Sequence, residues 1–291
     1  MDNLRTVLAS GDLIIGDGAF GTLCQERGLP AGVMPEAWNE SQPNDVIAIH
    51  RAYVEAGAHY VTTNTFGGSR TRLTEGGLGD RVFEINRIGA ELARQATDGR
   101  AWVAGSVGPT GRLMEPYGDL SATEAQEIFE EQISGLLAGG VDLLVIETHH
   151  DTGEAGAALQ VARQQTDLPI FCTFAFNPKG RTMMGLRAPQ AATEMGALGA
   201  DAVGANCGDG PAAIAAALEQ MQEGTTLPLV AKSNAGIPQM GPDGQALWDV
   251  TPEQLAEYAR EFVNLGARII GGCCGSSPTH IAAIAAALGR R

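Results

Sequence analysis

The stretch "LIIGDGAFGTL" at residues 13–23 decides between two folds for this chain. Its apolar run leads directly into Gly16-x-Gly18-x-x-Gly21, the glycine spacing of a dinucleotide-binding loop. In such a loop the third glycine begins a long helix, and an acidic residue ends the next strand roughly 20 residues later. Here the segment 22–43, "TLCQERGLPAGVMPEAWNESQP", has glycines and prolines that allow at most about two helical turns. The context therefore excludes a dinucleotide loop.

Short apolar runs rich in β-formers recur along the whole chain and alternate with segments of helical periodicity. The predicted strands are 13–18, 60–66, 102–108, 143–148, 170–176, 202–208, 229–236 and 268–275. Three of the intervening helices carry start signals. Ser121 with Glu124 forms a capping box, Thr251-Pro252 with Gln254 forms another, and Ser277 precedes Pro278 at the start of the last helix.

Eight strands that each precede a helix predict a single (β/α)₈ TIM barrel, formed by residues 1–291 as one domain. A doubly wound sheet is the competing arrangement. We find no Pro/Gly/Ser linker that would divide the chain. In a barrel the active site lies at the C-terminal ends of the strands, so the glycine turn after the first strand belongs to the catalytic face.

Composition excludes several classes of function. The net charge is −15, from 19 basic and 34 acidic residues, and this argues against nucleic acid as a partner. The N-terminal residues lack the apolar region of a signal peptide, and no apolar run is long enough to span a membrane. The five cysteines do not resemble a disulfide framework. These features predict a cytoplasmic protein in a reducing compartment.

Three cysteines are predicted to meet at one end of the barrel. Cys207 ends the sixth strand in "GANCG", while Cys273 and Cys274 end the eighth in "GGCCG". Zinc favours sulfur ligands in a tetrahedron, and three protein ligands leave the fourth position open for catalysis. The alternative is a redox switch through a disulfide between the adjacent cysteines. We interpret Cys24 and Cys172 as small buried hydrophobes.

Other polar residues fall at the same end. Glu147 ends the fourth strand, and a carboxylate there is costly unless it meets a cation or donors, so we interpret it as a ligand for a substrate ammonium group. The N–H groups of Ala19, Phe20 and Gly21 are predicted to form a nest for a carboxylate or phosphate.

The histidines are expected to contribute less to the site. We expect His149 and His150, which follow the fourth strand, to be solvated loop residues. His280 lies in the first turn of the last helix, and we expect an ordinary helix residue rather than a partner of a metal ligand.

A site with three thiolates is a poor Lewis acid for water, but it suits a substrate thiol, whose pKa it would lower. This chemistry indicates alkyl transfer to sulfur. The motifs "GDGAFGT", "TTNTF", "GSVGPTGR", "IETHHD", "GANCG", "SNAGIP" and "GGCCGSSPTHI" occur in this order. Together they resemble the homocysteine S-methyltransferase family, which includes the homocysteine-binding module of cobalamin-dependent methionine synthase and betaine–homocysteine methyltransferases.

The resemblance implies one Zn²⁺ per chain, held by Cys207, Cys273 and Cys274, with the thiolate of homocysteine as the fourth ligand and methionine as the product. It also implies that Asp17, the Gly18–Gly21 turn and Glu147 hold the amino-acid end of homocysteine, and that Asn234 lies near the zinc. The Asp-x-His-x-x-Gly pattern that holds cobalamin is absent, since Thr148 stands two residues before His150.

The resemblance therefore implies that the methyl group, carried as methylcobalamin, arrives on a separate corrinoid protein. A free onium donor, such as betaine, S-methylmethionine or another sulfonium, is the alternative. It would require aromatic faces, for which Trp38, Tyr117 and Trp248 are the candidates. A different thiol or selenol as acceptor, and a Cys–Cys redox or zinc-binding protein without methyltransferase activity, also remain open.

Overall fold

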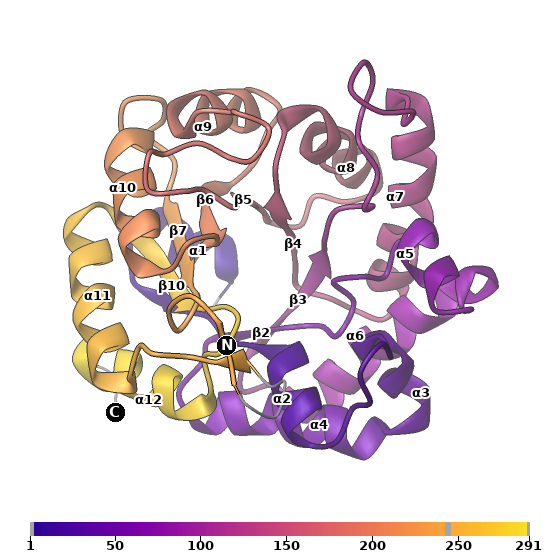
Figure 1. Cartoon of the computed structure of the whole chain (residues 1–291), viewed down its shortest axis with the longest axis horizontal. Coiled ribbons are helices and arrows are strands. Elements are labelled where there is room, and N and C mark those ends of the chain that lie inside the picture. Colours follow the sequence, from indigo (N-terminus) through magenta and orange to yellow (C-terminus); the bar gives the residue numbers. More distant parts are fainter. Residues whose placement is uncertain (1–2, 242–245, 290–291) are drawn as a thin grey trace.

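The fold was obtained as a computed structural model, which describes residues 3–241 and 246–289. Eight parallel strands form a ring with helices around it (Figure 1). The strands are β1 (Ile14–Ile15), β2 (Tyr60–Thr62), β3 (Trp102–Val107), β4 (Leu143–His149), β5 (Ile170–Phe174), β6 (Ala202–Cys207), β7 (Leu229–Ser233) and β10 (Ala267–Gly272). Their order in the sheet is β1-β10-β7-β6-β5-β4-β3-β2. All eight predicted strands are present, most of them one to four residues shorter than expected.

Helices surround the ring and follow the strands, except α1 (Leu4–Ser10), which precedes β1 and packs against one end of the barrel. The others are α2 (Phe20–Glu26), α3 (Trp38–Ser41), α4 (Pro43–Glu55), α5 (Arg70–Glu75), α6 (Val82–Thr97), α7 (Ala122–Ala138), α8 (Thr152–Gln165), α9 (Ala188–Ala197), α10 (Pro211–Met221), α11 (Pro252–Asn264) and α12 (Pro278–Ala287), with 3₁₀ turns η1 (Pro35–Ala37) and η2 (Gly79–Arg81). No helix in the described part of the chain is long and apolar enough to cross a membrane.

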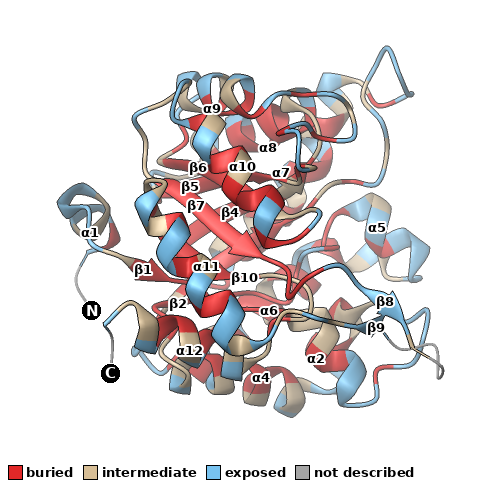
Figure 2. Cartoon of the chain, turned by 60° about the vertical axis from the view of Figure 1, so that its left-hand side comes forward, coloured by how far each residue is buried: buried red, intermediate tan, exposed pale blue. Residues whose placement is uncertain are grey.

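Two apolar layers build the barrel. Inside the ring, one side chain from each of several strands, such as Tyr60, Val145 and Phe171, forms a small buried cluster, and Leu4 of α1 packs against it. A larger cluster fills the space between the strands and the surrounding helices. Figure 2 shows the buried strands in the interior, with α1 at one end and the hairpin of β8 (Gln239–Met240) and β9 (Ala246–Leu247) at the other. Residues after the strands therefore lie at the hairpin end.

The ring closes between β1 and β2 largely through side chains. The His59 N–H donates to the Ile15 carbonyl at 2.7 Å, and the Ile15 N–H donates to Nδ1 of His59 at 2.8 Å. One step further along, the Thr62 N–H donates to the Asp17 carboxylate at 2.6 Å. The Asp17 carboxylate thus accepts the hydrogen bond that a backbone carbonyl would accept in a regular strand pair, and it helps to close the barrel between β1 and β2.

The predicted helix starts are mostly confirmed. Thr251 and Gln254 form a complete capping box at α11, and Ser277 caps α12 together with the ring of His280. At α7 the box is only half formed. Ser121 accepts the Glu124 N–H, but the Glu124 carboxylate pairs with Arg112 instead of returning to the cap.

Candidate active site

The three predicted cysteines converge at the C-terminal end of the barrel. Cys207 is the last residue of β6, and Cys273 and Cys274 directly follow β10, with β7 between the two strands. Their sulfur atoms all lie within 4.8 Å of one another, and Sγ of Cys207 is 3.9 Å from Sγ of Cys274. A disulfide needs about 2.05 Å, whereas two sulfurs on one tetrahedral zinc at about 2.3 Å would lie about 3.8 Å apart. The spacing fits a shared metal ion.

Backbone contacts hold the adjacent cysteines in place. The Cys273 N–H donates to the Ser233 carbonyl at 2.7 Å, and the Ala235 N–H donates to the Cys274 carbonyl at 2.9 Å. Contact with Cys207, followed by burial, raises the pKa of the Cys273 thiol well above its ordinary value. Three neighbouring thiolates would repel one another, so a cation between them is what would make the deprotonated set stable. The donor set and spacing suit Zn²⁺.

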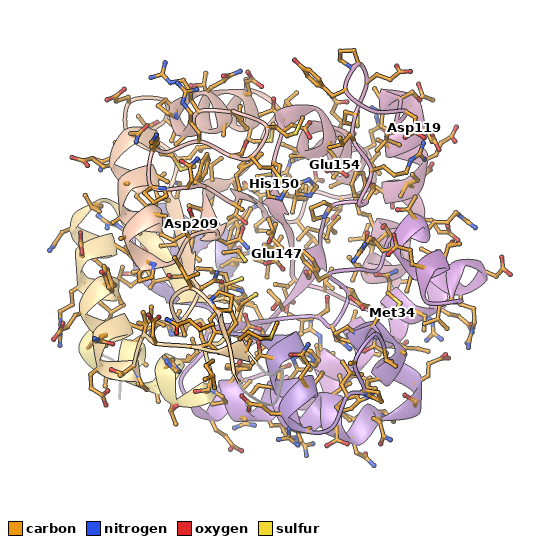
Figure 3. The ribbon with its side chains drawn as sticks, in the orientation of Figure 1. Met34, Asp119, Glu147, His150, Glu154 and Asp209 are labelled. Carbon is orange, nitrogen blue, oxygen red and sulfur yellow. The ribbon has the colours of Figure 1, made fainter. Side chains whose placement is uncertain are left out.

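Glu147 lies beside the cysteines on the inner side of β4. Its side chain is buried, and Oε1 accepts a hydrogen bond from Oγ of Ser106 at 2.6 Å. Figure 3, viewed along the barrel, places Glu147 near the centre of the ring. Among the residues that the structure describes, the other oxygen, Oε2, has only a long contact of 3.5 Å with Nδ2 of Asn206. One carboxylate oxygen therefore remains available to a ligand.

Asp17 is fully buried and already has three donors. Oδ2 accepts from the N–H and the hydroxyl of Thr62, and Oδ1 lies 2.9 Å from Nζ of Lys232. Burial is the largest effect on Lys232 and would lower its pKa, but Asp17, Tyr60 and Glu147 together outweigh burial and raise that pKa well above its ordinary value. Since a carboxylate offers about four acceptor positions, Asp17 retains room for one further donor. The sequence analysis did not predict a role for Lys232, although a lysine within the apolar strand "LVAKSN" indicates a buried charge that needs a partner.

The glycine turn after β1 is built differently from the predicted nest. The Ala19 N–H donates to the Ser276 carbonyl at 2.9 Å, so it is not free for a ligand, and that part of the prediction is wrong. A side chain at Gly18 would place its Cβ 2.4 Å from the same carbonyl, which explains the glycine. Phe20 and Gly21 begin α2, where N–H groups have no acceptor within the helix.

Asn234 follows β7 and lies between the two cysteine strands, as expected. Its Nδ2 donates to the Gly208 carbonyl at 3.0 Å, directly after Cys207. Its Oδ1 is buried and has no partner among the described residues. The Asn234 side chain therefore has one amide oxygen available to a ligand at the C-terminal end of β7.

Asn206 is a site residue that the sequence reading did not identify. It precedes Cys207 on β6, and its amide bonds to the backbone and hydroxyl of Thr148. Thr148 and Cys207 are two non-glycine residues with left-handed backbones, at φ of 64° and 58°. Such conformations cost about 1–3 kcal/mol and cluster at functional sites. An asparagine next to one of the three clustered cysteines, in an otherwise apolar strand, was the available signal.

The expectation that His149 and His150 are both solvated loop residues is wrong for His149, which is the last residue of β4. The left-handed Thr148 turns the chain, so His149 points outward and is fully buried, with its ring 6.1 Å from that of Phe129 on α7. Its Nδ1 lies 3.4 Å from the buried Glu154 carboxylate. His150 is half-buried, and burial lowers its pKa.

His280 caps the start of α12. Its Nδ1 accepts the Ser277 N–H and lies 2.9 Å from the Ser277 hydroxyl, and its Nε2 lies 3.0 Å from the Val250 carbonyl. The remaining cysteines match expectation. Cys24 and Cys172 are fully buried, and burial raises the pKa of each thiol to about 12. Neither is a nucleophile at neutral pH.

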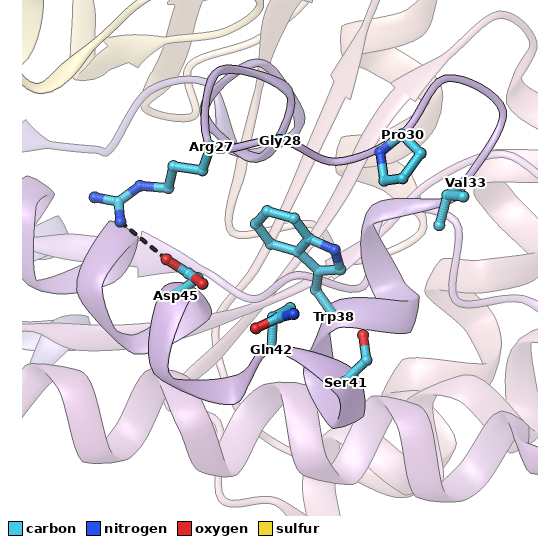
Figure 4. Close-up of a pocket in the computed structure, with 8 residues that line it drawn as sticks. All are labelled: Arg27, Gly28, Pro30, Val33, Trp38, Ser41, Gln42 and Asp45. Carbon is cyan, nitrogen blue, oxygen red and sulfur yellow. Dashed lines mark hydrogen bonds and ion pairs between the residues drawn. The ribbon is translucent and has the colours of Figure 1, made fainter.

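A surface pocket of about 420 Å³ lies apart from these residues, between the C-terminal end of α2 and the helices α3 and α4 (Figure 4). Trp38 forms one wall, and a half-exposed ion pair joins Arg27 to Asp45 at 3.2 Å. None of the cysteines or Glu147 lines it. We assign it no part in the chemistry.

Comparison with known proteins identifies the family to which this fold and sequence belong. A family model described as homocysteine S-methyltransferase matches residues 14–288. The chain belongs to the homocysteine S-methyltransferase family. The fold expectation is also confirmed, since the chain superposes on the homocysteine methyltransferase MmuM from Escherichia coli, in its metallated form, with a TM-score of 0.82, 26% identity and coverage of 98% of this chain and 99% of MmuM.

Members of the homocysteine S-methyltransferase family with different names are equally similar to this chain. Methionine synthase of Mycobacterium tuberculosis is 32% identical over 296 residues, which is 95% of this chain but 24% of that protein. Betaine–homocysteine S-methyltransferase 1 of Rattus norvegicus is 32% identical over 306 residues, which is 96% of this chain and 72% of that protein. The chain thus spans about a quarter of the methionine synthases it matches. Membership supports methyl transfer to homocysteine and leaves the methyl donor undetermined.

Proposed function

We propose that the chain is a zinc-dependent S-methyltransferase that converts homocysteine to methionine, with the methyl group delivered by a separate corrinoid protein. The observation that carries this proposal is the group of three sulfur atoms within 4.8 Å at the carboxyl end of the barrel. Cys207, Cys273 and Cys274 would hold the zinc ion. When bound, the ion would lower the pKa of the homocysteine thiol, so that a nucleophilic thiolate exists at neutral pH.

The chain's own residues would fix the two charged groups of the amino acid. Glu147, with one oxygen occupied by Ser106 and the other nearly free, would receive the substrate ammonium, and Asp17 would supply its remaining acceptor position. The N–H groups of Phe20 and Gly21 would receive the carboxylate. Asn234 would direct its unpaired Oδ1 toward the zinc and the ammonium from the side of β7.

The loops around the site support a protein as the methyl donor. Most of the large apolar side chains that are exposed lie in the segments that follow barrel strands, at the same end as the cysteines: Val33, Phe66, Leu113, Tyr117, Met183, Ile237, and Met240 and Leu247 of the β8–β9 pair. The loop 175–187 also carries three basic residues, all exposed, and no acidic residue, in a chain of net charge −15. An apolar rim with one basic loop suits a partner protein with an acidic face.

A free onium donor is the second candidate, favoured by the 32% identity to a betaine–homocysteine methyltransferase. The candidate aromatic residues have separate surroundings. Trp38 is buried beneath the outer pocket, Tyr117 is 78% exposed, and only Trp248 packs next to the cysteines, against Gly275. A single aromatic face gives a weaker cation site than a cage.

The oxidation state of the cysteines is relevant to the cellular compartment in which the protein works. All five are free thiols, including three that lie close enough to oxidise with little movement. Such a group persists in a reducing compartment, so we propose that the protein works in the cytoplasm.

Methionine formation measured by mass spectrometry tests the function. Zinc-loaded protein, homocysteine and a reductant would be supplied with methyl-labelled methylcobalamin, betaine, dimethylsulfoniopropionate or S-methylmethionine, beside a no-enzyme control and a Cys273→Ala control. Labelled methionine from methylcobalamin alone would support the corrinoid proposal. Turnover with betaine or a sulfonium would replace it with the second candidate. Full activity in the zinc-free protein or in Cys273→Ala would refute the zinc-dependent function.

A further inference from the structure

Asn206 occupies the point where the cysteine cluster meets the Glu147 side of the site. Its side chain is completely buried. Oδ1 accepts the Thr148 N–H at 2.9 Å, and Nδ2 lies 2.7 Å from Oγ1 of the same threonine. Nδ2 is also 3.5 Å from Oε2 of Glu147 and 3.8 Å from Sγ of Cys273. One amide therefore contacts β4 and the segment directly after β10, besides its own strand.

The contacts fix the orientation of this amide. A backbone N–H can only donate, so the atom facing Thr148 N must be the oxygen, and the amide nitrogen faces the other way. One of its two hydrogens is used by the Thr148 hydroxyl. The second is left between the Glu147 carboxylate and the Cys273 sulfur, which are both acceptors.

We propose that Asn206 is a positioning residue that couples the zinc ligands to the carboxylate that receives homocysteine. The inference rests on the proposed function. Through Thr148, Asn206 holds the left-handed turn that ends the inner face of β4 at Glu147. Its Nδ2 also lies 3.8 Å from Sγ of Cys273, and with zinc bound its second N–H would donate to the Cys273 thiolate; such a bond would orient a metal ligand and reduce its electron donation.

Few other side chains satisfy these requirements. Aspartate has the same shape and keeps the acceptor for the Thr148 N–H, but it has no N–H to donate. It also adds negative charge beside Glu147 and the thiolates. Serine is too short to reach both Thr148 and Cys273. The Asn206→Asp variant therefore removes the coupling with little change in volume.

Asn86 provides a matched control. It is also completely buried, and its Nδ2 donates two hydrogen bonds, to the carbonyls of Gly68 and Val82 on the outer side of the barrel. Asn86→Asp removes two buried amide donors and adds a buried charge without touching the cysteines. If replacing a buried asparagine by aspartate destabilises the protein wherever it is made, both variants should lose stability.

The test measures zinc affinity by chelator competition, homocysteine affinity of the zinc-loaded protein by calorimetry, and the thiolate-to-cobalt charge-transfer band of cobalt-substituted protein. We expect Asn206→Asp to weaken zinc binding by about 10- to 100-fold, to weaken homocysteine binding, and to shift the cobalt band. Asn86→Asp should leave all three unchanged. If Asn206→Asp does not fold, Asn206→Ser carries the same expectations.

Zinc and homocysteine affinities within twofold of wild type, with an unshifted cobalt band, would overturn the proposal, as would equal changes in the Asn86 control. These results leave the proposed function intact, because wild type still binds zinc and homocysteine. If wild type itself binds neither, the proposed function fails, and this inference fails with it.

Discussion

Replacing Lys232 by methionine tests how the barrel closes beneath the candidate site. Lys232 is 2% exposed, and its ammonium lies 2.9 Å from the Asp17 carboxylate, which is fully buried. Methionine fills a similar volume but leaves Asp17 as a buried charge without a cation. Removing one partner of a buried ion pair costs about 3–5 kcal/mol. The two hydrogen bonds from Thr62 persist and offset part of this, so we expect the lower end of the range.

A cost of about 3 kcal/mol corresponds to a more than 100-fold change in the folding equilibrium, and to a decrease of about 6 °C in Tm at about 2 °C per kcal/mol. Urea unfolding of the zinc-free, reduced protein, followed by circular dichroism and tryptophan fluorescence, measures it. The double variant Asp17→Asn with Lys232→Met removes both charges and keeps an acceptor for the Thr62 N–H. It should recover most of the lost free energy.

Arg87→Met is the surface control, since it breaks a partly exposed ion pair with Glu91 and should change stability by less than about 0.5 kcal/mol. The reasoning is refuted if Lys232→Met costs no more than that control. It is also refuted if the double variant is as unstable as the single one, because the unpaired Asp17 charge would then not be the cause.

Three further predictions concern the site and its surroundings. Cys207→Ser should reduce zinc content below one ion per chain at sub-stoichiometric chelator, measured by atomic emission, and retained full occupancy would argue against three sulfur ligands. Gly275→Ala should destabilise the protein by about 2–4 kcal/mol, since a Cβ there would lie 2.2 Å from the Trp248 ring at a φ of 76°; an unchanged tryptophan fluorescence spectrum and unfolding midpoint would contradict it. Burial would raise the pKa of Glu154, but His149 and Thr110 outweigh it and hold that pKa below its ordinary value of 4.5, so the stability it contributes is present above about pH 4.5 and lost as the pH falls through the folded-state value. Glu154→Gln should therefore flatten the acid limb of a stability–pH curve, and an unchanged slope between pH 5 and 3 would speak against this.

The convergence of the cysteines could be predicted from sequence because barrel topology alone brings strand ends together. Cys207 and Cys273 are separated by one strand in the ring, and no detail of side-chain packing was needed to infer it. The residue type is what predicts the metal, since three sulfur ligands favour zinc.

The partners inside the barrel depend on register, which the sequence does not reveal. Lys232 and Asp17 come from strands that are far apart in sequence and meet only when β10 lies between β1 and β7. The orientation of His149 depended on one left-handed residue, Thr148, whose backbone is stabilised by Asn206. A non-glycine residue in that conformation is uncommon, so no local pattern predicts it.

Zinc K-edge X-ray absorption spectroscopy of the zinc-loaded protein, before and after addition of L-homocysteine, tests the central claim most directly. Cys207, Cys273 and Cys274 should give three sulfur ligands at about 2.3 Å, and homocysteine should raise the count to four. Fewer than three protein sulfurs, or a spectrum that homocysteine does not change, would contradict the account.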